Sequence, residues 1–213
     1  MTGAETQLLQ LLKDRSFKRG TFRLASGDMS DYYIDGKMTE VYSEAVPLIG
    51  QILYERTQDL HIDAIGGLEV GAVPLTTAAV FSYHLHGRKI EGFWVRDKAK
   101  THGARKIIEG NLKPGSRVVI VDDVITKGGS AVKAIKEVQE LGCNVVLVLS
   151  LVDRLQGAED LFRAEGVENY QPVFTLRDFI AKSDAIFSFP GLEMYKDGKM
   201  ASKEWPVRHW NEE

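Results

Sequence analysis

The sequence predicts an α/β fold in which a doubly wound, parallel sheet is flanked by helices. Apolar runs of strand length alternate along the chain with stretches of helical periodicity, and strands that alternate with helices pair in parallel through crossovers. The run at 145–152, VVLVLSLV, does not alternate apolar with polar residues, as expected of a strand buried on both faces. With 213 residues, the chain is long enough to bury a full core in one domain.

The first third of the chain contains a helix, two short strands and a second helix. A leucine stripe of helical spacing predicts the first helix over residues 5–14. Residues 22–35, FRLASGDMSDYYID, predict two short strands on either side of a Ser-Gly-Asp turn. An amphipathic pattern predicts the next helix over residues 43–57, with Pro47 in its first turn, where a proline is tolerated.

The remaining chain continues the alternation and ends in a polar segment. An apolar run predicts a strand over 117–121, and helical periodicity follows over 130–141. Residues 98–110, KAKTHGARKIIEG, are polar and basic without periodicity, which indicates a loop. Because the chain turns polar and irregular near its end, we expect one domain over 1–186 and a polar tail over 187–213. The other predicted elements are a strand at 62–68, a helix at 75–85 and a strand at 92–96.

Composition and charge exclude several classes of protein. The formal net charge is −3 and 27% of the residues are charged, which fits neither a disordered chain nor a basic nucleic-acid-binding protein. Cys143 is the single cysteine, so no disulfide can form within the chain, and we expect it to be a small buried hydrophobe. The sequence starts without the pattern of a signal peptide, and no apolar run approaches the roughly 18 residues of a membrane span. We therefore expect a cytoplasmic protein.

The most informative stretch is VVIVDDVITKGGSA at 118–131, where an apolar run meets two acids and a glycine pair. Ligands of open α/β sheets bind beyond the carboxyl ends of the strands, and Asp122 and Asp123 fall at that edge, just after the strand expected over 117–121. The following segment, 126–130, leads into the N-terminus of a helix. Its glycines let successive N–H groups converge on one anion, and the helix start and two hydroxyl groups add further attraction. This segment is predicted to bind phosphate.

The two acids suit a different ligand from the glycine segment. Carboxylates do not bind phosphate directly, so the pair suits sugar hydroxyls, a magnesium ion or a group that becomes positive during a reaction. Two structural alternatives remain, because Asp-Asp after a strand also occurs in receiver domains and Gly-Gly before a helix is often an ordinary turn. The chain has no G-x-x-x-x-G-K-[ST] loop and no G-x-G-x-x-G fingerprint after a strand, which excludes those two kinds of nucleotide site.

The stretch VVIVDDVITKGGS resembles the phosphoribosyl pyrophosphate signature of type I phosphoribosyltransferases: an apolar strand, two acids, two apolar residues, Thr, a variable residue, Gly, a variable residue, and Ser or Thr. The resemblance implies the fold of that family, a mostly parallel twisted sheet flanked by helices, with a small N-terminal hood over about residues 1–40. It also implies that the loop holds the 5-phosphate of the ribose and that the acids face the ribose hydroxyls. The residues so implied are Asp122, Asp123, Val124, Ile125, Thr126, Lys127, Gly128, Gly129 and Ser130.

Residues 95–110, VRDKAKTHGARKIIEG, resemble the mobile catalytic loop of the orotate phosphoribosyltransferases, whose pattern includes Lys-x-His-Gly. This segment separates the orotate enzymes from the purine enzymes better than the phosphate loop does. Asp97 stands where many members carry a lysine, and Lys98 follows one place later. The residues that match the pattern are Arg96, Lys100, His102 and Gly103.

In that family the loop closes over the active site of the neighbouring subunit. The resemblance therefore implies a homodimer with shared active sites. In it Arg96 and Lys100 neutralise the leaving pyrophosphate, and His102 hydrogen-bonds or protonates it. A basic loop that opens again also lets the product escape, so loop motion can limit turnover.

Three further stretches agree with this resemblance. Residues 22–35 resemble the hood, with Ala25 where some members place a substrate-contacting lysine, and Lys37 is a candidate to supply that contact. The stretch GGLEVGAVPL resembles the pyrophosphate loop, without the lysine that some members have there. LVDRLQGAEDLF resembles the segment in which an arginine after a buried strand pairs with the orotate carboxylate. The residues implied to bind orotate are thus Thr126 and Arg154.

The resemblance implies an orotate phosphoribosyltransferase of pyrimidine biosynthesis, which converts orotate and phosphoribosyl pyrophosphate into orotidine 5-phosphate and pyrophosphate. Magnesium is implied as cofactor, bound mainly through substrate oxygens, and neither nucleic acid nor membrane is an expected partner. Two alternatives stay open on the residues: a purine-type phosphoribosyltransferase and a non-enzymatic regulator that senses phosphoribosyl pyrophosphate. The catalytic residues implied are Lys100, His102, Asp122 and Asp123.

Overall fold

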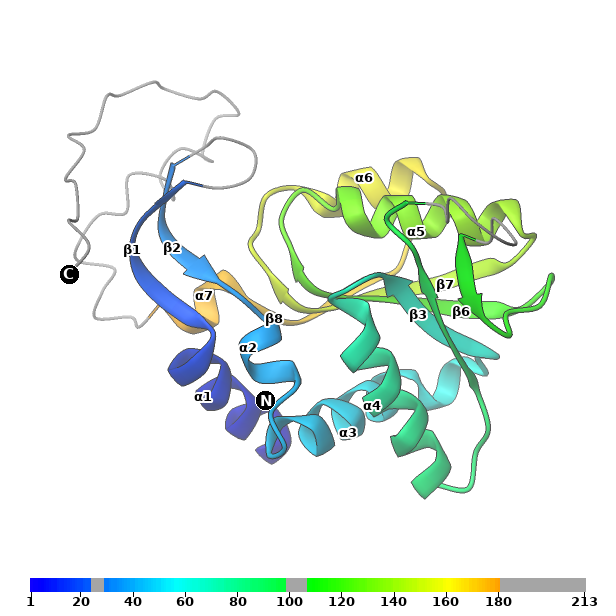
Figure 1. Cartoon of the computed structure of the whole chain (residues 1–213), viewed down its shortest axis with the longest axis horizontal. Helices are drawn as coiled ribbons and strands as arrows, with labels where there is room; N and C mark the ends of the chain where they lie inside the picture. Colours follow the sequence, from blue (N-terminus) through cyan, green and yellow to red (C-terminus); the bar gives the residue numbers. More distant parts are fainter. Residues whose placement is uncertain (24–28, 99–106, 181–213) are drawn as a thin grey trace. The chain divides into compact units, whose positions relative to one another are not determined.

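The computed structural model describes residues 1–23, 29–98 and 107–180 (Figure 1). Met1–Phe179 form one compact unit around a six-stranded sheet, with strand order β5-β4-β3-β6-β7-β8. Every pairing in this sheet is parallel except that of β4 with β5. The predicted α/β fold with a mostly parallel sheet is therefore confirmed. The expected division into residues 1–186 and a tail over 187–213 falls outside the described residues and stays a prediction.

The strands at the centre of the sheet are buried on both faces. In β6, the side chains of Val119, Ile120 and Val121 are fully buried, because helices cover both sides of this strand. Continuous apolar runs are the sequence signature of such strands, and the predicted strands at the centre are confirmed. The strands are β3 (Ala64–Leu68), β4 (Glu91–Val95), β5 (Ile108–Gly110), β6 (Arg117–Ile125), β7 (Asn144–Asp153) and β8 (Tyr170–Thr175).

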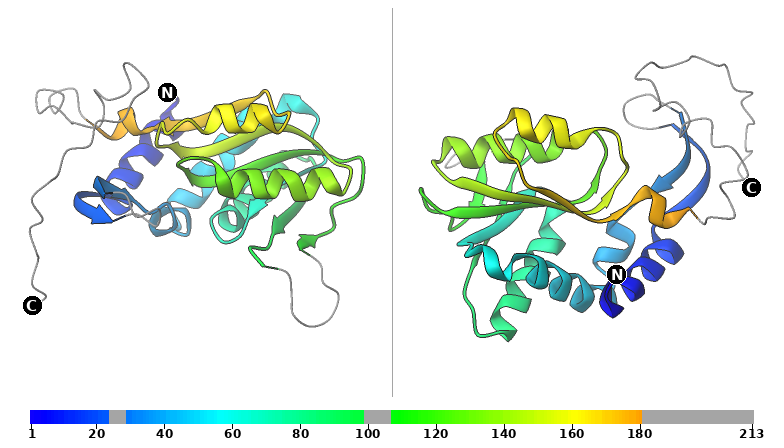
Figure 2. Two further views of the ribbon diagram at one scale, coloured as in Figure 1. Left: turned by 90° about the horizontal axis from the view of Figure 1, so that it is seen from above. Right: turned by 180° about the vertical axis from the view of Figure 1, so that it is seen from behind.

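Two layers of helices sandwich the sheet. Figures 1 and 2 show α3 (Ala45–Thr57) and α4 (Ala72–Leu85) on one face, and α5 (Gly129–Glu140) and α6 (Ala158–Ala164) on the other. A short 3-10 turn, Gln58–Leu60, follows α3. Close packing at the centre depends on a glycine of β3. A Cβ atom on Gly67 would lie 2.1 Å from the Val121 carbonyl oxygen and 2.8 Å from the Ala72 Cβ, so a larger residue there would push the elements apart.

The hood is a separate small layer formed by the N-terminal segments. Strands β1 (Phe17–Arg23) and β2 (Met29–Ile34) pair antiparallel, so the two short strands are present, but β1 begins five residues before the predicted stretch 22–35. The preceding helix α1 (Gly3–Arg15) begins with a capping box between Thr2 and Glu5. The remaining short helices are α2 (Lys37–Glu40), which follows the hood strands, and α7 (Leu176–Phe179), whose Phe179 ring lies 5.5 Å from that of Phe17.

The structure corrects the sequence prediction at the end of β6. The strand does not end at Val121 but runs to Ile125, so Asp122 and Asp123 lie inside it. The cause is tertiary pairing: β7 continues alongside, and Asp122 is opposite Ser150. Six elements were not predicted from the sequence, namely α2, the 3-10 turn after α3, β5, α6, β8 and α7. Cys143 is 7% exposed, as expected for a buried thiol.

Candidate active site

The predicted site residues that the structure describes lie at one edge of the sheet, beyond the carboxyl ends of β3, β4 and β7 and around the carboxyl end of β6. Parallel pairing causes this, because it aligns the ends of the strands and the segments that follow them. Each of these strands is followed by one of the predicted segments. They are the stretch after Leu68, the loop that begins at Arg96, the glycine segment 126–130 and the turn that begins at Arg154.

The glycine segment between β6 and α5 has the form of an anion site. Gly128 is the N-cap of α5 and has φ +86°, a conformation that favours glycine. A Cβ atom there would also lie 2.9 Å from the ring of Phe162 in α6, so α6 packs closely against the backbone of this segment. No side chain caps α5 and its first turn has no acidic residue, which leaves its first N–H groups available to an anion.

The residues of the phosphate signature contribute in different ways. Val124 and Ile125 pair with Val152 and Asp153 of β7, so their side chains belong to the sheet and only their backbone lies near the segment. The Ile125 carbonyl accepts a hydrogen bond from the Arg154 N–H at 2.9 Å. Thr126 is half-buried, whereas Lys127, Gly129 and Ser130 are exposed at the open side of the segment.

The two acids are buried next to each other. Asp122 is 8% exposed and Asp123 is 7% exposed, and the Asp123 N–H donates a hydrogen bond to Asp122 Oδ1 at 3.0 Å. Burial, followed by the neighbouring charge of Asp123, raises the pKa of Asp122 well above its usual value. Two negative charges side by side are therefore disfavoured, and the pair suits a ligand that brings positive charge.

Asp123 is held by segments that are far apart in the sequence. A Cβ atom on Gly71 would lie 2.4 Å from Asp123 Oδ1, and one on Gly36 would lie 2.9 Å from Asp123 Oδ2, so bare backbone packs on both sides of the carboxylate. Lys37 Nζ lies 3.3 Å from Asp123 Oδ2 and 3.1 Å from Asp35 Oδ1. Burial lowers the pKa of Lys37, but the charges of Asp123 and Asp35 outweigh it and raise the pKa overall.

The basic loop connects β4 and β5, which pair antiparallel at the same edge. The Arg96 N–H donates to the Ile107 carbonyl at 2.8 Å, which brings the two ends of the loop together. Arg96 Nη1 lies 3.6 Å from Glu109 Oε1 and 4.0 Å from Glu69 Oε2, and its buried Nε has no hydrogen-bond partner within the described residues. Two predicted catalytic residues, Lys100 and His102, together with Gly103, lie outside the described residues.

The first residues of the loop are tied to helix α5. Lys133 Nζ lies 3.0 Å from Asp97 Oδ1 and also donates to the Asp97 carbonyl. The hydrogen bond and charge of Lys133 lower the pKa of Asp97. Asp97, which stands where the family pattern has a lysine, therefore has an ion-pair partner of its own. The neighbouring Lys98 is exposed.

Arg154 is a buried cation at the hood side of the edge. It is 6% exposed and donates to Ser30 Oγ at 3.2 Å and to the Tyr32 hydroxyl at 3.4 Å. Its guanidinium also lies over the Tyr32 ring, 4.7 Å from the centroid. Among residues 1–23, 29–98 and 107–180, no carboxylate lies within ion-pair distance of Arg154. A buried cation without a carboxylate partner suits an anionic ligand.

Sequence reasoning missed some residues of this site. The sequence predicts no role for Ser30 and Tyr32 beyond the hood pattern, although they are the partners of Arg154. Glu40 was not noticed at all, because a glutamate in a short polar stretch is typical of a solvated surface. In the structure it is fully buried near Asp123.

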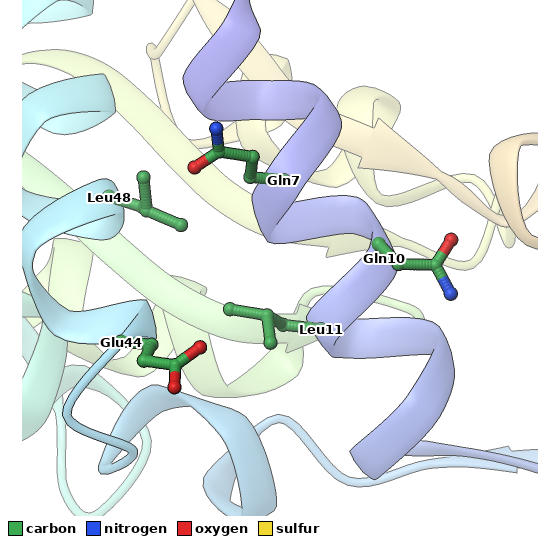
Figure 3. Close-up of a pocket in the computed structure, with 5 residues that line it drawn as sticks. All are labelled: Gln7, Gln10, Leu11, Glu44 and Leu48. Carbon is green, nitrogen blue, oxygen red and sulfur yellow. The ribbon is translucent and has the colours of Figure 1, made fainter.

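Two surface depressions of the described part lie away from the candidate site. One, of about 500 Å³, is an open groove between α1 and α3 that contains no predicted site residue (Figure 3). It is lined by Gln7, Gln10, Leu11, Glu44 and Leu48. A second depression lies at the opposite end of the sheet, around Asp63 and Ser116. The candidate site is therefore identified by the convergence of its residues and not by cavity size.

Two searches of the described residues bear on partners. No group of three or more His, Cys, Asp or Glu side chains in this part of the chain is arranged to hold a metal ion by itself. None of its helices is long and apolar enough to cross a membrane.

Known proteins are similar to this chain over most of its length. The model of the phosphoribosyl transferase domain family matches residues 39–165. The orotate phosphoribosyltransferase of Bradyrhizobium diazoefficiens is 43% identical over 183 residues, which is 84% of this chain and 97% of that protein. The enzyme of the same name from Streptomyces coelicolor is 42% identical over 158 residues, which is 74% of this chain and 87% of that protein.

Solved structures of orotate phosphoribosyltransferases are also similar to this chain. A crystal structure of Mycobacterium tuberculosis H37Rv orotate phosphoribosyltransferase matches with a TM-score of 0.73 at 39% identity, covering 83% of this chain and 98% of that one. The structure of that enzyme in complex with 5-phospho-alpha-D-ribosyl 1-diphosphate matches with a TM-score of 0.69 at 36% identity, with the same coverage. An adenine phosphoribosyl transferase of Trypanosoma brucei, at 14% identity and a TM-score of 0.61, shares the fold.

Proposed function

The chain belongs to the orotate phosphoribosyltransferase family, and from this premise we propose how its sheet edge performs the reaction. The phosphoribosyl group of phosphoribosyl pyrophosphate is transferred to orotate, which gives orotidine 5-phosphate and pyrophosphate in pyrimidine biosynthesis. The observation that carries this proposal is the convergence of an uncapped, glycine-lined helix start with a buried acid pair. One of these features suits a phosphate dianion and the other suits a sugar that becomes cationic.

The sugar phosphate is proposed to bind across the end of β6. The N–H groups of residues 126–130 hold the 5-phosphate, helped by the hydroxyls of Thr126 and Ser130. Asp122 and Asp123 then face the ribose ring and stabilise positive charge as the bond to pyrophosphate breaks. Because these groups are fixed before the substrate arrives, catalysis is mostly positioning and electrostatics.

Pyrophosphate leaves toward the ends of β3 and β4. We propose that N–H groups of the backbone around Gly71, which packs against Asp123, bind the leaving pyrophosphate. Arg96 borders the same region, and we propose that Lys100 and His102 complete the neutralisation of the leaving group when the loop closes.

Magnesium is part of the proposal as a partner of the substrate. Its preferred ligands are hard oxygens, and the described residues offer no three-ligand site of their own. We propose that the ion would be held mainly by substrate oxygens, and we assign it no protein ligand. When bound, the ion makes pyrophosphate a less basic leaving group.

Orotate is proposed to meet Arg154 through its carboxylate, with Thr126 nearby. The guanidinium is already oriented by Ser30 and Tyr32, and a planar guanidinium recognises a carboxylate through two parallel hydrogen bonds. A neutral purine has no carboxylate for this arginine, which supports the choice of base.

A homodimer with shared sites completes the proposal. Helix α4 has an apolar outer face, on which Phe81 is 57% exposed and Leu85 is 66% exposed one turn later. Val70, just before the helix, is 65% exposed. A second copy of the chain would bury this surface and bring its basic loop near the site. A cytoplasmic location, expected from the sequence, belongs to the same proposal.

The direct test is an assay with magnesium, phosphoribosyl pyrophosphate and one base at a time. Loss of orotate absorbance with formation of orotidine 5-phosphate is expected, and adenine and hypoxanthine are expected to give no nucleotide. Turnover of a purine without turnover of orotate would contradict the proposal. So would tight binding of phosphoribosyl pyrophosphate without turnover of any base.

A further inference from the structure

Glu40 is a buried acid that the proposed reaction does not use. It ends helix α2, and its residue exposure is 0%. Neither Oε1 nor Oε2 has a hydrogen-bond partner among the described residues. Buried polar atoms are nearly always hydrogen-bonded, so a carboxyl group with both oxygens unpaired requires an explanation.

The position of Glu40 connects it to the acid pair. Helix α2 starts at the point where Gly36 packs against the Asp123 carboxylate, and Lys37 of the same helix pairs with Asp123. The charged groups close enough to act on Glu40 are Asp123, Lys37, Asp122 and Asp35. On the neighbouring helices α1 and α3, the two arginines have other partners: Arg15 donates to the Met38 carbonyl and lies over Tyr42, and Arg56 pairs with Glu5. Lys13 of α1 is not among the charged groups that act on Glu40.

An ionised Glu40 would be unfavourable in these surroundings. An isolated carboxylate in a buried site has a high desolvation cost, and three other acids lie near it against one lysine. Burial first, and then the charge of Asp123, raises the pKa of Glu40 to about 9. A charged Glu40 would also compete with Asp123 for Lys37, which is the cation that both acids face.

We propose that Glu40 is a positioning residue for the phosphoribosyl transfer: it keeps a proton beside the acid pair, so that Lys37 stays with Asp123 and Asp123 stays oriented toward the sugar. The inference rests on the proposed function of the acid pair. Glu40 does not contact the reacting atoms and acts through Lys37 and Asp123. Loss of the Glu40 proton adds a negative charge next to the two aspartates and weakens the ion pair between Lys37 and Asp123.

The test is the pH profile of kcat/KM for phosphoribosyl pyrophosphate in the wild type and in Glu40→Gln. Glutamine has the same shape and cannot ionise. Between pH 8 and pH 10 the wild type is expected to lose about tenfold more kcat/KM than Glu40→Gln, because one proton leaves the site. The same substitution at exposed Glu44, Glu44→Gln, is the control and is expected to keep the wild-type profile. Parallel profiles of the wild type and Glu40→Gln would overturn the proposal.

A second measurement needs no variant and does not depend on folding of Glu40→Gln. In wild-type protein labelled with ¹³C at glutamate Cδ, one carboxyl signal is expected to titrate near pH 9. Titration of every glutamate signal below about pH 6 would overturn the proposal, since the usual range is near 4 to 5.

Failure of this inference can be distinguished from failure of the proposed function. If orotate is turned over but the pH profiles of the wild type and Glu40→Gln are parallel, the role of Glu40 is wrong and the function stands. If no base is turned over but one glutamate carboxyl signal titrates near pH 9, the proton on Glu40 is supported and the proposed reaction is wrong.

Discussion

The two halves of the candidate site differ in the groups that they offer to a ligand. The segment 126–130 is open, has exposed residues at its rim and offers backbone N–H groups without a side-chain cap. The acid pair and Glu40 form a buried cluster whose properties depend on charged side chains and on one lysine. The phosphate half should therefore be sensitive to backbone conformation, whereas the sugar half should be sensitive to charge. The following predictions test that difference, from the largest expected effect to the smallest.

The largest effect is expected at the charge that faces the sugar. Asp123→Asn keeps the shape of the side chain and removes the negative charge, so kcat should fall by about 100-fold or more, the range for loss of one oriented group in the transition state. Steady-state kinetics with both substrates saturating measure this. The KM for phosphoribosyl pyrophosphate should change far less than kcat, since the 5-phosphate is held elsewhere. A kcat within threefold of the wild type would show that Asp123 does not stabilise the reacting sugar.

Arg154→Ala should act on the base and spare the sugar phosphate. Removal of the guanidinium leaves the orotate carboxylate without its partner, so the KM for orotate should rise by about tenfold to 100-fold, the usual effect of losing a charged hydrogen bond. The KM for phosphoribosyl pyrophosphate is the internal control. Equal increases in both KM values would remove Arg154 from the base site.

Gly128→Ala should damage the phosphate half through its backbone. Alanine at φ +86° is strained and its Cβ would meet the Phe162 ring, so the unfolding free energy should fall by more than about 1 kcal/mol and the KM for phosphoribosyl pyrophosphate should rise. Gly129→Ala is the matched control, because a Cβ there meets nothing within 4 Å and its φ is not positive. Similar KM values for the two variants, measured beside denaturant unfolding, would contradict the backbone account.

The last prediction has the smallest expected effect on activity at neutral pH and concerns a gradual change of stability with pH. The pKa of Glu40 is about 9 in the folded state and near 4.5 in the unfolded state, so the folded protein binds one more proton between these pH values. Stability should therefore fall as pH rises from 4.5 to 9, by up to about 1.4 kcal/mol per pH unit from this group. Glu40→Gln has no carboxyl group at this position, so its free energy of unfolding should not show this fall. The difference in the free energy of unfolding between Glu40→Gln and the wild type, measured with denaturant, should therefore grow in favour of the variant from pH 5 to pH 8. A constant difference would mean that Glu40 does not hold a proton.

Much of the fold could be predicted because its strands and helices carry strong local patterns. The runs in β6 and β7 are apolar throughout, and the stripe of α5 is strongly periodic. Strand β8 was missed because Pro172 interrupts its short run, and an edge strand tolerates a proline that a central strand does not. Strand β5 was missed because three polar-flanked residues at an edge give no periodic signal.

The candidate site also has one part that could be predicted from the sequence and one part that could not. The glycine segment is continuous in the sequence, so its conformation and the position of its helix could be inferred from one motif. The surroundings of Asp123 could not, since they bring Gly36 and Lys37 against an acid 86 residues further along the chain. Local sequence contains no information about such a contact, which is why the buried state of Glu40 was not foreseen.

The central claim is that residues 126–130 hold the 5-phosphate while Asp122 and Asp123 face the sugar ring. A crystal structure with phosphoribosyl pyrophosphate and magnesium tests it most directly. The account predicts phosphate oxygens within hydrogen-bond distance of the N–H groups of this segment, and ribose hydroxyls within reach of both carboxylates. A sugar phosphate bound away from the end of β6, with this segment empty, would contradict it.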